Sequence, residues 1–179
     1  MKKSYFLVVC FLSLISKAQT INFPDYHFSN KLQENISLDI NHDGQIQVNE
    51  AQLATSLDLN NASINDLTGI EYFTNLESLS CNYNALTTIN LSALTNLRYL
   101  SCGSNQLTSL DLSMLPNLSV LTIEDNPLTS LNISGLNLTK LWCYNTNLTQ
   151  VDVSGMTNLT ELRIYDMPLV TSINASGAS

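Results

Sequence analysis

Residues 39–50 contain closely spaced oxygen-bearing side chains in an order that suits metal binding. The segment reads Asp-Ile-Asn-His-Asp-Gly-Gln-Ile-Gln-Val-Asn-Glu and matches every position of the pattern D-x-[DN]-x-[DN]-G-x5-E. Loops of this pattern surround calcium with hard oxygen ligands. Gly44 supplies the sharp turn in the middle of the loop. The predicted ligands are the side chains of Asp39, Asn41 and Asp43, the backbone carbonyl of Gln45, a water held by Gln47, and both carboxylate oxygens of Glu50.

The loop resembles those of EF-hands and dockerins, which generally work in pairs, whereas this sequence has a single copy. We therefore expect a structural role for it, and a polar turn that only imitates the pattern is the alternative. Phe28 and Leu32 are spaced four apart on a short helix predicted to start near Pro24 and Asp25. With Ile46 they can cover the apolar residues that open the rest of the chain, namely Leu57, Leu59 and Ile64.

Leucines recur with a period of about 21 residues from residue 76 to residue 164, as in the spacing from Leu79 to Leu100. The order L-x-x-L-x-L-x-x-N-x-L resembles leucine-rich repeats. Leu57 lies 22 residues before Leu79 and indicates a degenerate first coil. One coil cannot bury its own apolar side chains and must stack on a neighbour. The resemblance implies a leucine-rich-repeat solenoid of the α/β type, mostly short parallel strands with turns, in five to six coils of 20–22 residues.

Asparagine and cysteine also recur at fixed positions of the repeat. Asn84, Asn105 and Asn126 fall where each short strand ends, and in the leucine-rich-repeat family this asparagine hydrogen-bonds the turn; Thr146 and Met167 replace it in later coils. The three cysteines of the repeats occupy an inward position that is filled by isoleucine in other coils: Cys81, Cys102 and Cys143. We expect buried free thiols in one column, with a bridge between adjacent coils as the alternative.

Residues 1–18 have a positively charged start, an apolar run and small residues before Gln19, which is typical of a cleaved secretory signal. The alternative is a lipobox at residues 7–10. Removal of the signal leaves four basic residues against 15 acidic ones, a net charge of −11. That charge disfavours nucleic acid and anionic lipid as partners. Beyond the signal no apolar run is long enough to span a membrane, so we expect a cap at 19–54, a solenoid at 55–179 and no membrane insertion.

Outward strand positions should form a concave face that carries large side chains suited to binding. The candidate contact residues are Tyr83, Tyr99, Glu124, Trp142, Tyr144, Arg163 and Tyr165. No nucleophile–base set can be assembled around the two histidines, His27 and His42, so we expect no enzyme. The alternative interpretation of the face is a scatter of ordinary surface residues.

The order of signal, short helix, calcium loop and coils resembles secreted leucine-rich-repeat proteins of surface-colonising Gram-negative bacteria. That resemblance implies a secreted or cell-surface protein that mediates adhesion or protein–protein interaction, and we expect a monomer. A glycan-binding accessory protein that uses the exposed Tyr/Trp stripe is the alternative function, and a structural array without a ligand is a third.

Overall fold

The computed structural model describes residues 19–35 and 37–178, so the predicted signal segment 1–18 and the lipobox lie outside the described residues. No helix in the described part of the chain is long and apolar enough to cross a membrane. The elements are α1 (Tyr26–Gln33), α2 (Val48–Ala51), β1 (Ser56–Asp58), the short 3-10 helix η1 (Ile70–Tyr72), β2 (Ser78–Ser80), β3 (Tyr99–Ser101), β4 (Val120–Thr122), β5 (Lys140–Trp142), β6 (Gln150–Asp152), β7 (Glu161–Arg163) and β8 (Ser172–Asn174).

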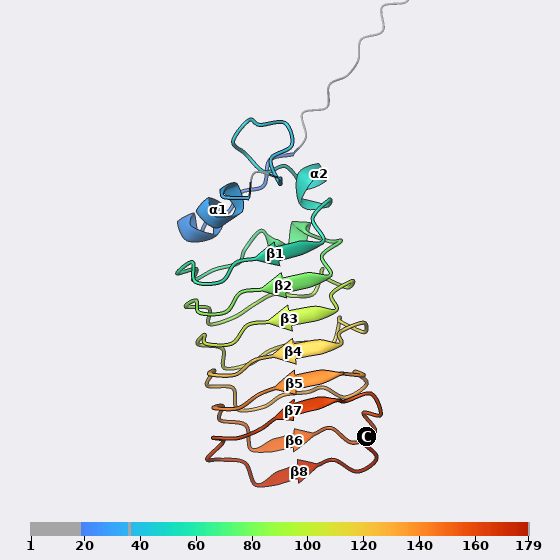
Figure 1. Cartoon of the computed structure of the whole chain (residues 1–179). Helices are drawn as coiled ribbons and strands as arrows, with labels where there is room; N and C mark the ends of the chain where they lie inside the picture. Colours follow the sequence, from blue (N-terminus) through green and yellow to red (C-terminus); the bar gives the residue numbers. More distant parts are fainter. Residues whose placement is uncertain (1–18, 36, 179) are drawn as a thin grey trace, which may run out of the picture.

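Six strands form one parallel sheet in the order β1-β2-β3-β4-β5-β7. Figure 1 shows these strands stacked one per coil below the N-terminal cap. The central leucine of each strand is paired with that of the next: Leu57, Leu79, Leu100, Leu121, Leu141 and Leu162. This register confirms the predicted solenoid and includes the degenerate first coil.

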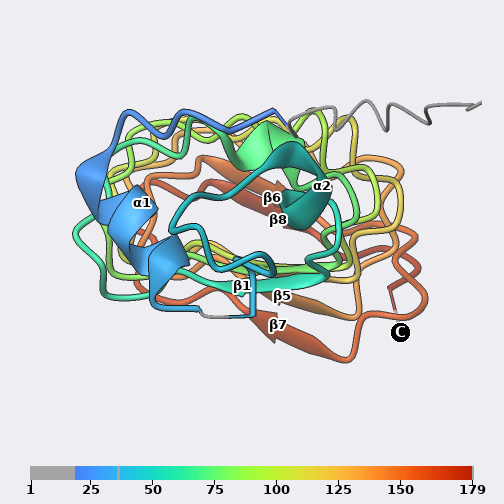
Figure 2. The same ribbon diagram turned by 90° about the horizontal axis from the view of Figure 1, so that it is seen from above.

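A second, two-stranded sheet pairs β6 with β8 in parallel, with Val151 opposite Ile173. The view from above places β6 and β8 on the side of the coil away from β5 and β7 (Figure 2). In the coils that lack β6 and β8, the side opposite the six-stranded sheet is made of turns, and η1 is its one helical piece within residues 55–178. The prediction of mostly short parallel strands with turns is therefore confirmed.

Each coil leaves its strand through a residue with left-handed backbone. These residues have φ between 51° and 56° and are Asn61, Tyr83, Ser104, Asp125, Asn145 and Asp166. The next residue in three coils is the predicted asparagine. In the central one, the Asn105 amide donates to the carbonyls of Cys81, Cys102 and Gly103 and its oxygen accepts from Leu86 N. Thr146 takes the same place with one side-chain bond, to the carbonyl of Cys143.

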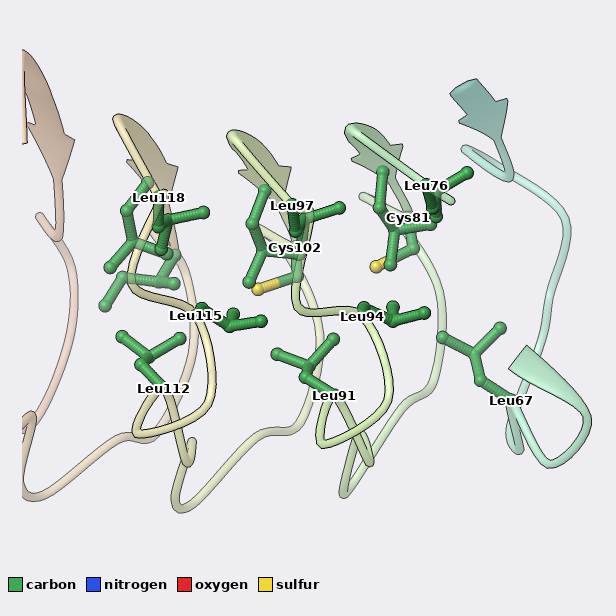
Figure 3. Close-up of a cluster of buried hydrophobic side chains, with 14 of the residues drawn as sticks. Leu67, Leu76, Cys81, Leu91, Leu94, Leu97, Cys102, Leu112, Leu115 and Leu118 are labelled. Carbon is green, nitrogen blue, oxygen red and sulfur yellow. The ribbon is translucent and has the colours of Figure 1, made fainter. Parts of the chain in front are cut away.

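The core is a set of leucine columns that run from coil to coil. Figure 3 shows the repetition, with Leu91 and Leu94 in one coil matched by Leu112 and Leu115 in the next. The cysteines join the same core: Cys81, Cys102 and Cys143 are free and fully buried. Burial raises the pKa of the Cys81 and Cys143 thiols to about 12 and that of Cys102 well above its usual value. The thiols therefore stay protonated and pack as small apolar groups.

The cap closes the N-terminal end of the core. Asp25 begins α1 by accepting a hydrogen bond from Phe28 N, and its other oxygen accepts from the backbone of Asn65 and Asp66 in the first coil. Phe28 and Leu32 are buried in the same cluster as the first coil. The ring of Phe23 lies against Gly69, where a Cβ would come within 2.5 Å of it. The helix start and the burial of the cap residues are as predicted.

Candidate partner-binding face and calcium loop

Outward side chains of the six-stranded sheet form what we call the strand face. The hydrogen-bond ladder continues beyond each strand, as in Asp125 N to Tyr144 O and Asn145 N to Tyr165 O. Side chains therefore repeat in columns along the solenoid. The first column holds Ser78, Tyr99, Val120, Lys140 and Glu161; the second holds Ser80, Ser101, Thr122, Trp142 and Arg163; the third holds Asn82, Gly103, Glu124, Tyr144 and Tyr165.

In the N-terminal half of the strand face, small polar side chains of the second and third columns form hydrogen bonds with one another. Asn82 N donates to the side-chain oxygen of Asn60 at 2.7 Å. The Asn82 oxygen in turn accepts from Ser101 Oγ and Gly103 N. Ser101 Oγ and Thr122 Oγ1 lie 2.6 Å apart. Because these groups satisfy one another, this half offers few free donors or acceptors to a partner.

The C-terminal half of the face carries the large side chains. The guanidinium of Arg163 lies 4.0 Å from the centroid of the Trp142 ring, and the Lys140 ammonium lies 4.8 Å from it. Both cations also contact Glu161, each at 2.9 Å. The hydrogen bond from Lys140 holds the pKa of Glu161 below its usual value. Stacking and ion pairing thus fix the position of Trp142 on the sheet.

Tyr144 and Tyr165 continue this cluster in the third column. Their rings are stacked, with centroids 4.4 Å apart and an angle of 9° between the planes. Desolvation, the nearby Glu124 carboxylate and Tyr165 raise the pKa of Tyr144 to about 12. The Tyr144 hydroxyl therefore stays protonated. Tyr165 is 52 % exposed, so the stacked pair is open to a partner.

Glu124 lies next to the tyrosines in the same column. Its carboxylate folds back over Gly103, where a Cβ would come within 2.6 Å of Glu124 Cδ and Oε1. The Oε2 atom is buried and has no hydrogen-bond partner among the described residues. Desolvation raises the pKa of Glu124, with Asp125 adding to the rise and Arg163 opposing it.

Five of the seven predicted contact residues are thus brought together: Glu124, Trp142, Tyr144, Arg163 and Tyr165. Tyr83 and Tyr99 lie elsewhere. Tyr83 is at the left-handed position after β2 and is 63 % exposed, and Tyr99 begins β3 in the first column. Gly103 was not among the predicted contact residues, although its lack of a side chain in a column of larger residues indicates a close approach there.

Lys140 and Glu161 were also missed as members of the cluster, because their link to Trp142 depends on pairing between strands about 20 residues apart. Their presence bears on the glycan alternative. Sugars bind to the open face of an aromatic ring, but Arg163 and Lys140 already lie over the ring of Trp142. This arrangement disfavours a sugar-stacking platform at the tryptophan.

The predicted calcium loop is held by its own side chains. Asp39 accepts from the backbone of Asp43 and Gly44, and Asn41 accepts from Asp43 N. Glu50, which is 2 % exposed, accepts from Ile40 N and Asn41 N through one oxygen and from Gln47 N through the other. The side-chain oxygens of Asp39, Asn41 and Glu50 therefore accept hydrogen bonds from the backbone of the loop.

Within residues 19–35 and 37–178, no three His, Cys, Asp or Glu side chains gather as a group that could hold a metal ion. The three predicted carboxylate ligands, Asp39, Asp43 and Glu50, are therefore not gathered as such a group in this structure. All of the predicted ligands are oxygens, and three of them are carboxylates, so the chemistry of the donor set fits calcium.

One edge of the loop is paired with the start of the described chain. Ile21 N donates to Ile46 O, Val48 N donates to Gln19 O, and Thr20 and Gln47 form an antiparallel bridge. A single loop would otherwise leave these backbone groups open to solvent. The N-terminal segment thus takes the pairing position that a second loop would fill.

Comparisons with known proteins agree with this architecture. Residues 95–137 match the family model described as leucine-rich repeats in two copies. The functional domain of internalin J from Listeria monocytogenes, described as including a cysteine ladder, superposes with a TM-score of 0.73 at 35 % identity over 90 % of this chain. The fold is a leucine-rich-repeat solenoid. Internalin C2 of the same species shares this solenoid fold, with a TM-score of 0.70 at 20 % identity over 90 % of this chain and 79 % of its own.

The solenoid covers only part of these relatives. Internalin J of Listeria monocytogenes serotype 4b strain F2365 is 39 % identical over 80 residues, which are 44 % of this chain and 9 % of that protein. The chain also spans 38 % of the internalin J domain of known structure. In the solenoid described here the column of cysteines is interrupted, because Ile123 lies between Cys102 and Cys143.

Proposed function

We propose that this protein is a secreted or cell-surface module, not an enzyme, that binds a protein partner through the C-terminal half of its strand face. The observation that carries the proposal is the cluster of Trp142, Tyr144, Arg163 and Tyr165 on adjacent strands. Tryptophan, tyrosine and arginine are the residue types that dominate binding energy at protein interfaces. The likeness to internalin J supports an interaction or adhesion role. We propose in addition that the module acts as a monomer.

The cluster is also preorganised for binding. Its side chains are held by ring stacking, by cation–π contacts and by ion pairs to Glu161 on a paired sheet. Immobilising a flexible side chain on binding costs about 0.5–1.5 kcal/mol. Much of that cost is already met in the free protein, so a partner gains more from each contact.

The test is binding of residues 19–179 to an array of extracellular-matrix, host-surface and bacterial-surface proteins, followed by affinity measurement for each hit. The double variant Trp142→Ala/Tyr165→Ala should weaken binding by roughly 30-fold or more, the loss expected when interface anchors are truncated. Met114→Ala, an exposed apolar residue on the turn side, is the matched control and should leave affinity unchanged.

A partner that is lost with Met114→Ala and retained by the double variant would overturn the assignment of the face. An array of oligosaccharides run in parallel tests the glycan alternative. Sugar binding that depends on Trp142, with no protein hit on the strand face, would favour that alternative instead.

We propose in addition that the loop at 39–50 binds calcium and that the ion stabilises the cap. Support comes from the complete match to the motif and from the bonds by which Asp39, Asn41 and Glu50 hold the backbone of the loop. When bound, the ion would add ligand bonds between the start of the loop and the first turn of α2. That link would tie α2 to the loop and keep Ile46 in the core beside the first coil.

The test is thermal unfolding with calcium and with chelator. At a calcium concentration 100 times the dissociation constant, binding adds about 2.7 kcal/mol to the free energy of unfolding. For a chain of this length that corresponds to an increase in Tm of roughly 5–10 °C. Asp39→Ala should abolish the dependence on calcium. Asp66→Ala, an exposed carboxylate that bonds its own turn at Thr68, is the control and should retain it. Equal melting temperatures in calcium and chelator would refute calcium binding.

A further inference from the structure

Glu124 is the one carboxylate of the strand face that ends in an unsatisfied atom among the described residues. An unpaired buried acceptor costs about 1–3 kcal/mol. The residue as a whole is only half-buried, and the terminal torsion of a glutamate turns over a broad range. A small rotation over Gly103 therefore brings Oε2 to a donor that arrives from solvent, with no change in the sheet.

The surrounding charges leave Glu124 available. Both cations of the cluster, Lys140 and Arg163, are paired with the same carboxylate, Glu161. Asp125 is engaged by Asn145 and by Ser104 Oγ. The whole chain carries a net charge of −8. Two buried polar atoms of this face have no hydrogen-bond partner among the described residues, the donor Trp142 Nε1 and the acceptor Glu124 Oε2, and of the two only Glu124 carries a charge.

The stacked tyrosines favour a planar group as the donor that would bind Glu124. Tyr144 is next to Glu124 in the third column, and its ring is backed by Tyr165. A planar cation can stack on such a ring while it donates to the neighbouring carboxylate. Arg163 already adopts this mode in the same face, because its guanidinium lies over Trp142 and donates to Glu161.

We propose that Glu124 and Tyr144 form a pocket for an arginine side chain of the protein partner. The guanidinium donates to the Glu124 carboxylate, which rests on Gly103, and lies against the Tyr144–Tyr165 stack. This inference rests on the proposed function for its biological setting and names the chemistry of the partner. The pocket itself can be tested without knowing the partner.

The probe is N-acetylarginine amide, with N-acetylcitrulline amide as its neutral counterpart of nearly equal shape. Trp142 is the only tryptophan of the chain and lies beside the pocket, so its fluorescence reports binding, and tyrosine NMR signals locate it. The arginine amide should bind roughly tenfold more tightly than the citrulline amide, as expected for a charge-assisted hydrogen bond. Both titrations are run at matched ionic strength.

Two variants change the pocket in different ways. Glu124→Gln removes the charge and should make the two amides bind equally. Gly103→Ala keeps the charge but displaces the carboxylate, because the new Cβ overlaps Glu124 Cδ, and it should weaken the arginine amide by a similar factor. Glu77→Gln, an exposed glutamate paired with Arg98, is the matched control and should bind as the parent protein does.

The inference is overturned if the arginine and citrulline amides bind alike, or if Glu124→Gln keeps the preference for arginine. Circular dichroism of each variant separates a lost pocket from a lost fold. The failure of the proposed function looks different. In that case no protein binds the strand face, while the preference for the arginine amide and its loss in Glu124→Gln remain measurable.

Discussion

Asn105 shows how a single polar side chain holds a coil of the solenoid. Its amide makes three hydrogen bonds to carbonyls of its own coil and the preceding one, and its oxygen accepts from Leu86 N. The side chain is 8 % exposed, so water cannot replace these bonds readily. The preceding residue, Ser104, has the left-handed backbone found at the same place in the other coils.

Asn105→Ala should lower the free energy of unfolding by roughly 2–4 kcal/mol, because it leaves buried backbone groups unpaired. Urea denaturation measures the change. Asn117→Ala is the control: that residue is exposed and makes one bond, to Thr95 O, so its loss should cost less than about 0.5 kcal/mol. Equal losses of unfolding free energy in the two variants would show that Asn105 stabilises the solenoid no more than an exposed asparagine does.

Glu124 should make stability depend on pH in the direction opposite to most carboxylates. Its folded-state pKa is raised by desolvation and by Asp125, against the opposing charge of Arg163, and Tyr144 and Cys102 are the other titratable groups beside it. A raised pKa means that the folded state holds the proton more tightly. Its contribution is therefore full below the ordinary value of 4.5 and is lost as pH rises through the folded pKa.

In the Glu124→Gln variant the side chain at this position does not ionise between pH 4 and pH 7. The stability of the variant relative to the parent protein should therefore increase between pH 4 and pH 7, as measured by urea denaturation at both values. Subtracting parent from variant removes the titration of the other carboxylates. A difference that does not change with pH would contradict the raised pKa.

At the scale of elements, Asp25 joins the cap to the first coil. Burial pushes the pKa of Asp25 up, but bonds from the backbone of Phe28, Asn65, Asp66 and His27 outweigh it, so the pKa is lowered overall. The carboxylate thus begins α1 and also anchors it to the turn at 65–66. Its contribution to stability is present above pH 3.8 and is lost as pH falls through the lowered folded value.

Asp25→Ala should cost about 1–2 kcal/mol, the usual loss for a helix N-cap, and should release α1 before the coils unfold. Hydrogen exchange measures this, with faster exchange expected at the amides of α1 and unchanged exchange in β2 to β5. Glu34→Ala, which removes only the exposed ion pair with Lys31, is the control and should leave exchange unaltered. Uniformly faster exchange across the coils would mean that the cap and the solenoid open as one unit.

At the scale of the whole molecule, stability should behave as a sum over neighbouring coils. Deletion of residues 97–117 removes one full period and joins Asn96 to Leu118 in the same register. The shortened chain should fold with a lower Tm, because β4 can pair with β2 as β3 does. Circular dichroism and thermal unfolding test this.

Deletion of residues 97–107 is the matched control, since about half a period is lost. That change removes β3 but keeps the turn side of its coil, so no complete coil joins β2 to β4, and the protein should fail to fold. Two deletions with the same effect would show that the repeat period does not govern the fold.

The sequence by itself determined the solenoid, its register and its inward columns. The spacing of 21 or 22 residues between leucines can be read along the chain without information on distant contacts. It correctly predicted that Leu57, Leu79 and Cys102 are buried at equivalent inward positions. The start of α1 at Asp25 was equally readable, because an N-cap depends on residues within one turn.

Only the tertiary structure decided which outward residues act together. Glu161 pairs with Lys140 and Arg163 because β5 and β7 are neighbours although β6 lies between them in the sequence. Gly103 belongs to the site only because Glu124 folds back over it. The same applies to Gln19–Ile21 and the loop at 46–48. Side-chain direction on a surface depends on what neighbouring coils present there, and a repeat pattern, which records burial, contains no information on that choice.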